Sequence, residues 1–410
     1  MSRALFTAVS GLRNHQVWLD VIGNNIANAN TTGYKASTVQ FNDILGQTIS
    51  SGVAPTATQG GVNPIQVGLG MTFGGITPNF MQGSIQTTNR STDMAIQGDG
   101  FFVLADGADR VYTRSGAFTL DANGTLVDSS TGFKVQGASG AIQISSGAQS
   151  TATATTRVLM KGNLDYTQAD GSTFVSTFNV LDSVGAPHTM TVTFTKNFAG
   201  AAGRWDWAVT KDASDTALSS LTTATGSVVF DATGAVASGA TQAVGLVYAA
   251  GAGVTTPQSI TLDFAAATNA TPITGVAAPS TVTLASQDGV ASGTLQSFAI
   301  GLDGAITAFF SNGKTSNVGT VQLASFANAA GLVKIGSNQY RESATSGTAA
   351  TGNPGTGSRG TIIAGALEQS NVDLAAEFSS MIIAERGFQA NARTISTANN
   401  MLEELVNLKR

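Results

Sequence analysis

The chain of 410 residues has no cysteine and only two histidines, His15 and His188. The missing cysteine excludes disulfide bonds, cysteine nucleophiles and thiolate zinc sites, and two isolated histidines make no histidine-rich metal centre. We therefore expect neither a metal nor another cofactor. A chain this long can bury a large core without such cross-links, and it is long enough for two to four domains.

Charge and long apolar runs are also scarce. Charged residues make up 11% of the chain, against roughly 25% in ordinary globular domains. The net charge is only −5 and no basic run exists, so we expect no nucleic-acid partner. No apolar segment approaches the roughly 20 residues of a membrane span. The N-terminal MSRALFTAVSGLRNHQVW lacks the uninterrupted apolar core of a signal peptide. We therefore expect no membrane insertion, and either a cytoplasmic location or export without a cleaved leader.

Glutamate is absent from most of the chain. The first is Glu342, and the other five lie between 368 and 404. Because glutamate favours helices and is depleted from strands, this distribution predicts a β-rich body and a helical C-terminal end.

Both ends of the chain carry apolar residues at alternating spacings of three and four, which is typical of an amphipathic helix or a coiled coil. Ser370 or Asn371 is a plausible N-cap for the second helix. The two helices could pair with each other or with copies in neighbouring subunits. The predicted self-assembly residues are Leu5, Leu12, Leu19, Ile22 and Ile26 in the first segment, and Leu374, Phe378, Met381, Phe388, Ile395, Leu402 and Val406 in the second.

The stretch VIGNNIANANTTGYK at 21–35 follows the first helical segment and is rich in asparagine. Asparagine side chains compete for backbone hydrogen bonds, and both asparagine and glycine accept left-handed conformations. The simplest interpretation is a helix end followed by a loop. A sharper hypothesis is a joint at which the helix frays into the β body, formed by Asn24, Asn25, Asn28, Asn30, Gly33 and Tyr34.

The body contains two similar β blocks, 111–137 and 298–323. The first has Asn123-Gly124, and the second has Asp303-Gly304 and Asn312-Gly313, each between apolar runs, which predicts hairpins. The blocks could be halves of one domain. The low-complexity stretch at 343–361 is interpreted as an extended linker that leads back to the terminal helix. The predicted organisation is a terminal helical coiled coil (1–30 and 371–410), extended connecting segments (31–69 and 346–370), a split β domain (70–145 and 292–345) and an inserted all-β outer domain (146–291). The predicted fold class is mainly β and multidomain with terminal α-helices.

Convergent catalytic groups are hard to find. DANG at 121–124 resembles the start of a calcium loop but lacks the further ligands. His15 lies on the helical seam, where packing is a better explanation than ligation, and His188 has no evident partner. Trp205 and Trp207 share one strand face, which favours sheet packing over a ligand platform. These observations favour a protein that is not an enzyme.

Three blocks resemble the rod and hook axial proteins of the bacterial flagellum. They are LFTAVSGLRNHQVWLDVIGNNIANANTTGYK at 5–35, VYTRSGAFTLDANGTLVDSSTGFKVQG at 111–137 and the helical signature at 365–410. The blocks cover about a quarter of the chain and stand in the family's order. The resemblance is closest to the hook members, because the rod members look shorter and lack a large middle insertion. The insertion itself matches no pattern that we can name.

The resemblance implies a structural subunit that self-assembles into a curved helical tube, the universal joint between motor and filament. It implies that the terminal helices pair as a coiled coil and line the inner tube, with the β domains forming outer shells. It also implies export by the flagellar type III apparatus, an extracellular location in the flagellum, and contacts with distal rod, hook cap and hook-filament junction proteins.

Other classes of protein remain open on the sequence. The first is the distal rod protein, a rigid shaft from the same family. The second is a secreted adhesin or surface-layer protein, suggested by the Thr/Ala/Gly-rich body. The third is an extracellular enzyme acting on glycans, which would need paired carboxylates.

Overall fold

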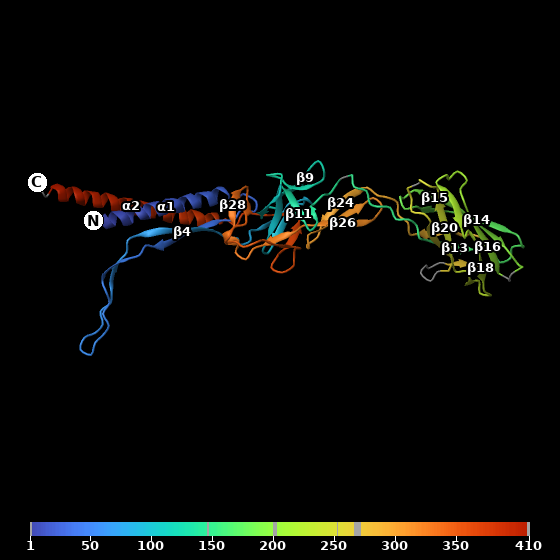
Figure 1. Ribbon diagram of the computed structural model, residues 1–410, viewed down its shortest axis with the longest axis horizontal. Helices are drawn as coiled ribbons and strands as arrows, with labels where there is room; N and C mark the ends of the chain where they lie inside the picture. The colour runs from blue at the N-terminus through green and yellow to red at the C-terminus, as the bar shows by residue number, and fades with distance from the viewer. Residues whose placement is uncertain (1, 146, 200–202, 252, 266–271, 408–410) are drawn as a thin grey trace. The chain divides into compact units, whose positions relative to one another are not determined.

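The computed structural model describes residues 2–145, 147–199, 203–251, 253–265 and 272–407. Within these residues the chain begins and ends with a helix, the residues between form strands, and the two helices lie side by side (Figure 1). The expected fold class, mainly β with terminal helices, is confirmed. The chain divides into two compact units, and we describe each by itself: the first holds 1–145, 298–307 and 317–410, and the second holds 146–297 and 308–316.

The helices of the first unit are α1 (Ser2–Ala27) and α2 (Leu374–Asn407), and they pack against each other. Asp373 caps α2, because its Oδ1 accepts hydrogen bonds from the backbone N–H groups of Ala375 and Ala376 at 2.9 and 3.1 Å. The N-cap is therefore Asp373. The sequence-based prediction of Ser370 or Asn371 as the N-cap was wrong. Residues 408–410 of the predicted helix lie outside the described residues.

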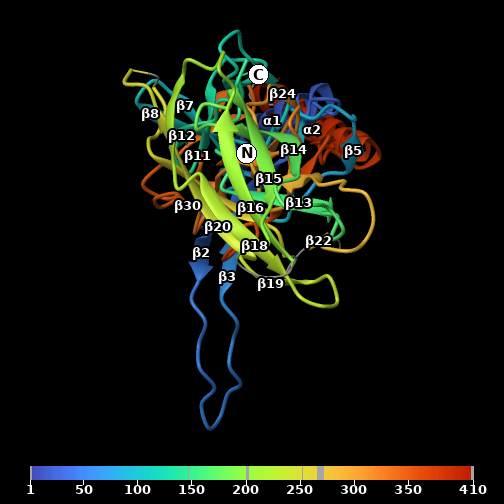
Figure 2. The ribbon, with the colours of Figure 1, turned by 90° about the vertical axis from the view of Figure 1, so that its right-hand side faces the viewer.

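The segment 31–69, predicted as an extended connection, forms most of a long hairpin that continues to residue 78. Strand β1 (Ser37–Asp43) pairs with β4 (Met71–Pro78), and β2 (Gln47–Ser50) pairs with β3 (Ile65–Val67). Figure 2 shows β2 and β3 continuing side by side into a narrow ribbon. Antiparallel pairing satisfies the backbone groups of this segment, although β2 and β3 are exposed along their whole length.

The low-complexity stretch at 343–361, interpreted as a linker, is also part of the β structure. Strand β30 (Ala350–Gly352) pairs with β27 (Leu323–Ser325), and β31 (Thr361–Ala364) pairs with β6 (Met94–Gln97). Strand β32 (Ala366–Glu368) then pairs with β5 (Ile85–Thr87). The interpretation as a linker was wrong, because ladder hydrogen bonds come from the backbone and a partner strand can recruit a segment of weak side-chain pattern.

A ten-stranded sheet forms the body of the first unit, and it joins strands from 101–141 with strands from 323–352, whereas most of the second β block, 298–323, belongs to a separate three-stranded sheet. Strand β29 pairs with β8, and β27 pairs with β7. Phe101, Tyr112 and Tyr340 form an aromatic cluster on this sheet with Phe80 and Phe326. The remaining strands of the sheet are β7 (Phe101–Asp106), β8 (Asp109–Thr113), β9 (Phe118–Leu120), β10 (Leu126–Asp128), β11 (Lys134–Gly137), β12 (Gly140–Ala141), β28 (Val333–Gly336) and β29 (Gln339–Arg341), with a short 3-10 helix at Ala329–Gly331.

The predicted turns occur, with one correction to their geometry. Gly124, Gly304 and Gly313 have φ of 76°, 75° and 76°, whereas neither Asn123 nor Asn312 has a positive φ. Only the glycine therefore adopts the left-handed conformation. The rule for two-residue hairpins had suggested this conformation for both residues of the pair. Gly304 lies between β24 (Leu295–Ile300) and β25 (Ala305–Phe310), and Gly313 lies between β25 and β26 (Thr315–Thr320). The residues of this three-stranded sheet are divided between the two units.

The second unit consists of two sheets that share one core (Figure 2). Trp205 and Trp207 alternate with partly buried neighbours along β16 (Arg204–Lys211), and both rings are buried in that core. Packing within the sheet, the favoured interpretation of these rings, is confirmed. The strands of the six-stranded sheet are β13 (Arg157–Asn163), β17 (Leu218–Thr222), β20 (Thr241–Tyr248), β21 (Gln258–Asp263), β22 (Ile273–Thr274) and β23 (Thr283–Gln287). Those of the five-stranded sheet are β14 (Thr173–Leu181), β15 (Pro187–Lys196), β16 (Arg204–Lys211), β18 (Thr225–Phe230) and β19 (Val236–Ser238).

Candidate assembly site at the helical ends

The two terminal helices run antiparallel and meet in one register. A Cβ added to Gly11 would lie 2.7 Å from the Asn391 side chain, and one added to Gly387 would lie 2.6 Å from the His15 ring. Further along, Asn25 Nδ2 donates to Glu377 Oε1 at 2.9 Å. Each helix thus places a polar side chain over a glycine of the other, and this exchange fixes how the helices align.

Small side chains make up much of the buried surface of this helix pair. Ala8 and Gly11 of α1 and Ala384 and Ala398 of α2 are buried. Among the predicted seam residues only Ile22 is buried, at 2% exposure. Small residues let helix backbones approach closely, so the contact between α1 and α2 differs from a seam of large apolar side chains. The partly buried seam residues are Leu5, Leu12, Leu19, Ile26, Met381 and Ile395.

Many large apolar side chains of the two helices are exposed. Phe6 is 73% exposed and Ile383 is 61% exposed. Spacing alone predicted five of these residues, namely Leu374, Phe378, Phe388, Leu402 and Val406. It missed Phe6, Val9, Ile382, Ile383 and Met401, because they fall outside the single seam that the spacing defines. We call these ten residues the exposed apolar helix face. A large exposed apolar surface on a water-exposed helix commonly marks an interaction site.

The asparagine-rich stretch contains one buried asparagine with a central position. Asn25 is 1% exposed. Its Nδ2 also donates to the backbone oxygen of Ser37 at 2.9 Å, and its Oδ1 accepts from the Ser37 N–H at 3.0 Å and the Tyr34 hydroxyl at 3.2 Å. Asn25 therefore ties the end of α1 to both β1 and α2.

The other asparagines of the stretch act locally. Asn28 Nδ2 donates to Asn24 Oδ1 at 2.7 Å, and Asn28 Oδ1 accepts from the Thr31 hydroxyl at 3.1 Å. Asn30 is exposed. None of the four asparagines has a positive φ, so the left-handed backbone expected for them is absent and α1 continues to Ala27. The side-chain amides of Asn25 and Asn28 bond to the backbone and to neighbouring side chains, and the Asn24 side chain accepts from Asn28.

Gly33 is the residue of the joint that needs an unusual backbone. Its φ is 69°, and a Cβ there would lie 2.7 Å from the backbone nitrogen of Ser115. Its N–H donates to the Glu368 carbonyl at 2.8 Å. Next to it, the Tyr34 ring is buried and lies 4.3 Å from Lys334 Nζ. The predicted joint residues thus meet strands that are far away in the sequence.

A buried charge network lies beside the joint, and sequence analysis missed it. Glu368 is fully buried, and its carboxylate contacts Lys35 Nζ at 2.7 Å and Arg114 Nε at 2.6 Å. Oε1 of Glu368 also accepts from the Gly83 N–H at 2.8 Å. Burial lowers the pKa of Lys35, while the Glu368 carboxylate acts in the opposite direction. The signal in the sequence was weak, since the three charges lie in separate strands and turns.

The start of α2 is held at the same place. Asn371 Oδ1 accepts from the Ala36 N–H at 2.8 Å, and its Nδ2 donates to the carbonyl oxygens of Asn79 and Met81 at 2.8 and 3.0 Å. Burial raises the pKa of Glu377, and the hydrogen bond from Asn25 partly opposes this shift. The helix pair is therefore anchored by hydrogen bonds where α1 ends and α2 begins. Along their length the two helices expose large apolar side chains.

The second unit has its own cluster of titratable groups. His188, which had no evident partner in the sequence, is buried with its Nδ1 2.6 Å from Asp215 Oδ2 and its Nε2 3.3 Å from Asp182 Oδ2. His188 therefore has two partners that the sequence did not reveal, because Asp182 lies in the turn before strand β15 and Asp215 lies in the turn after strand β16. Both aspartates also accept backbone hydrogen bonds within their own turns.

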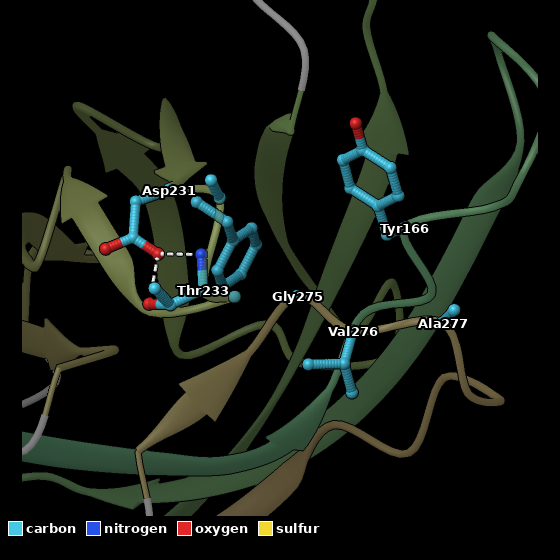
Figure 3. Close-up of a pocket in the computed structure, with 9 residues that line it drawn as sticks. Tyr166, Asp231, Thr233, Gly275, Val276 and Ala277 are labelled. Atoms are coloured by element: carbon cyan, nitrogen blue, oxygen red, sulfur yellow. Dashed lines mark hydrogen bonds between the residues drawn. The ribbon is translucent and has the colours of Figure 1, made fainter.

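A cavity of about 490 Å³ in the second unit is lined by Tyr166, Phe230 and Val276 together with two turns (Figure 3). The one carboxylate in its lining, that of Asp231, accepts hydrogen bonds from the Thr233 N–H and hydroxyl at 2.8 and 2.6 Å. Its role is therefore to hold a turn. In the described part of the chain, no group of three or more histidine, aspartate or glutamate side chains is arranged to hold a metal ion. None of the described helices is long and apolar enough to span a membrane.

Comparison with known proteins decides the family. The flagellar hook protein FlgE of Treponema pallidum is 38% identical, over the whole of both chains. The chain belongs to the flagellar hook protein FlgE family. Members of this family are structural proteins, which agrees with the expectation that the chain is not an enzyme.

Four family models match successive parts of this FlgE-family chain. They describe a flagella basal body rod protein (5–35), the flagellar hook protein FlgE/F/G D1 domain (95–169), the flagellar basal body protein FlaE D2 domain (148–290) and the flagellar basal body rod FlgEFG protein C-terminal region (363–408). The middle segment, which matched no pattern by inspection, thus has a family description of its own.

Two further comparisons are with a rod protein and with a solved structure. The flagellar basal-body rod protein FlgG of Bacillus subtilis is 32% identical over the whole of both chains. The similarity of this chain therefore extends to a relative that bears the rod name as well as to relatives that bear the hook name. Among solved structures, FlgE2 of Helicobacter pylori matches 68% of this chain and 98% of its own at 14% identity and a TM-score of 0.41, which is too weak a likeness to place individual residues.

Proposed function

We propose that the chain is the structural subunit of the flagellar hook and that it assembles into a helical tube through its terminal helices. The observation that carries this proposal is the exposed apolar helix face on a chain of the FlgE family. In water such a face is unfavourable. Heterologous contacts that do not close on themselves extend into a helical polymer. If neighbouring copies cover this face, its apolar side chains leave water and the subunits are joined into a tube.

The proposal assigns a role to each part of the chain. The terminal helices (1–30 and 371–410) pair as a coiled coil and line an inner tube. The β material at 70–145 and 292–345 forms a middle shell, and the segment 146–291 forms an outer domain. The segments 31–69 and 346–370 connect helices to shells. The tube lies outside the cell membrane and is curved, which makes it a universal joint that transmits motor torque to the filament.

The partners in this proposal are further copies of the chain, the distal rod, hook cap and hook-filament junction proteins, and the flagellar type III export apparatus. The joint at Asn24, Asn25, Asn28, Asn30, Gly33 and Tyr34 sets the direction in which the helix pair leaves the β shells. Its support is the hydrogen bonding of Asn25 and Asn371, which ties both helices to the same strands and turns.

The test places a charge on the exposed apolar helix face. Ile383→Lys is compared with Thr397→Lys, which adds the same charge at an exposed polar position of α2. Burial of an isoleucine side chain contributes about 1.5–3 kcal/mol, so Ile383→Lys should raise the critical concentration for assembly by roughly 10- to 100-fold. Sedimentation of polymers measures this concentration, and urea unfolding of the monomer checks that the subunit is intact. Equal assembly of the two variants would overturn the proposed surface.

The rod is a second candidate, favoured by the full-length match to a relative that bears the rod name. The two functions differ in the shape of the polymer, since a joint bends and a shaft stays straight. Negative-stain electron microscopy of tubes assembled from the full chain distinguishes them. Curved tubes support the hook, whereas straight tubes under all assembly conditions support the rod.

A further inference from the structure

His15 of α1 is a titratable side chain inside the contact between the two terminal helices. Its ring covers Gly387 of α2 and lies 6.0 Å from the Trp18 ring and 6.5 Å from the Phe41 ring of β1. Its Nδ1 atom is buried and has no hydrogen-bond partner. A buried polar atom without a partner is costly, and the cost rises steeply if the ring becomes charged.

No charged group near His15 is placed to compensate a proton on the ring. On α1 the neighbouring charges are Arg13 and Asp20, and both are exposed. On α2 the charges closest in sequence to Gly387 are Glu385 and Arg386, which bond to the amide of Gln389 instead. Strand β1 has only Asp43, which is exposed, and β4 has no charged residue. Among the described residues no carboxylate oxygen lies within 4.0 Å of a His15 ring nitrogen, whereas the two carboxylates beside His188 lie 2.6 and 3.3 Å from its ring nitrogens.

We propose that His15 makes the α1–α2 contact, and with it the assembly of the chain, sensitive to acid. The ring stays on Gly387 only as neutral imidazole, and protonation drives it toward water and separates the helices. This inference rests on the proposed function to the extent that assembly depends on the helix pair. The device is a single side chain placed over a glycine, and it requires no other partner.

The direction of the pH effect follows from the burial of the ring. Burial lowers the pKa of His15 from its ordinary value of 6.5. His15 therefore binds a proton more tightly in the separated helices than in the paired helices. Since the separated state carries more protons, the pairing weakens as the pH falls. Pairing is fully stable above about pH 6.5 and weakens as the pH falls through that value toward the lowered pKa. At the low-pH limit the equilibrium constant for pairing of the helices falls about tenfold for each unit by which burial lowers the pKa of His15.

His188 supplies an internal contrast in the second unit. Both of its ring nitrogens face carboxylates, those of Asp215 and Asp182. The tyrosine beside it, Tyr248, has its ring centre 5.2 Å away, and Lys211 Nζ donates to the Asp215 carbonyl at 2.8 Å. Both ring nitrogens of His188 therefore contact a carboxylate, whereas the buried Nδ1 of His15 has no hydrogen-bond partner. We expect mild acid to open the helix pair and leave the second unit folded.

The experiment compares tubes of the parent chain, His15→Phe and His15→Gln, assembled at about pH 7.5 and transferred to about pH 5.5. The subunits released are measured by centrifugation, and the opening of α1, α2 and the second-unit strands is measured by hydrogen exchange with mass spectrometry. The parent should release several-fold more subunits at the lower pH, with loss of protection in α1 and α2 alone. Both variants carry no titrating ring and should release equal amounts at the two pH values.

Each alternative outcome has a definite meaning. A parent chain that never forms tubes contradicts the proposed function. Parent tubes that release equal amounts at both pH values overturn the role of His15 and leave the proposed function standing. Variants that respond to acid as strongly as the parent also overturn it. If neither variant assembles, the hydrogen exchange of the parent chain decides. The inference is overturned if the protection of its α1 and α2, corrected for intrinsic exchange, is the same at both pH values.

Discussion

The helix pair and the second unit bury their side chains in opposite ways. The core of the second unit is closed: Trp205, Trp207 and Phe264 are all at most 2% exposed. The helix pair buries alanines, a glycine and asparagines, and leaves phenylalanine, isoleucine and methionine side chains in water. The core of the second unit is closed within one chain, whereas the helix pair has large apolar side chains that none of the described residues covers. Under the proposed function, folding of the second unit and assembly of the tube depend on separate parts of this sequence.

Trp207→Ala should have the largest effect and tests whether the second unit folds by itself. Removal of a buried tryptophan costs about 3–5 kcal/mol. We expect the urea midpoint of the second unit to fall while hydrogen exchange in the strands of the first unit is unchanged. The control Val184→Ala, at an exposed site of the same unit, should stay within about 0.5 kcal/mol. Equal losses in both units would break the comparison.

Glu368→Gln should have the next largest effect, and it acts on the first unit. Without its charge, the buried Lys35 and Arg114 lose their shared partner. Breaking a buried ion pair lowers the free energy of unfolding by about 3–5 kcal/mol. Burial already lowers the pKa of Lys35, so this side chain can lose its proton in the variant, and we expect a loss at the lower end of that range. Denaturant unfolding followed by hydrogen exchange measures the loss. Glu385→Gln, on the exposed side of α2, is the matched control and should change stability little.

Asn25→Ala should have an intermediate effect at the joint. The substitution leaves Tyr34, Ser37 and Glu377 without their shared partner, at a cost of about 1–3 kcal/mol. Asn24→Ala changes an exposed neighbour in the same helix and should cost less than about 1 kcal/mol. Exchange rates at the end of α1 and the start of α2 report the difference. If the two variants behave alike, the burial of Asn25 has no special role.

Gly387→Ala and Gly23→Ala should have the smallest effects, and these should have opposite signs. At Gly23 a Cβ meets nothing within 4 Å, so alanine should stabilise α1 by about 0.5–1 kcal/mol. At Gly387 the Cβ would lie 2.6 Å from the His15 ring, so the ring must move and the helix contact should weaken. Thermal dissociation of assembled tubes compares the two. Stabilisation by both variants would show that the helices do not need this close approach.

Much of the fold was predictable from local patterns. Spacing by three and four residues marked both helices, glutamate marked the helical end, and Gly124, Gly304 and Gly313 marked their turns. These signals depend on residues close together in the chain. The linker interpretation of 343–361 failed because the strand β30 is made by its partner β27, and a partner strand leaves little trace in the segment it recruits.

The candidate site was predictable only in part. Periodicity gave apolar positions on the helices, yet it could not say that Gly11 and Gly387 lie under Asn391 and His15, since close approach depends on two helices at once. It likewise marked Asn25 as one of several asparagines, and only its burial among Ser37, Tyr34 and Glu377 sets it apart.

The sequence by itself determined that this protein is mainly β with helical ends, has no cysteine chemistry and carries the signature blocks of flagellar axial proteins, because these properties follow from composition and local order. The tertiary structure alone decided that Glu368 joins Lys35 to Arg114 and that the two histidines have opposite surroundings. These contacts join residues that can be hundreds of positions apart, and a charge or a ring acquires its energy from the neighbours that folding places around it.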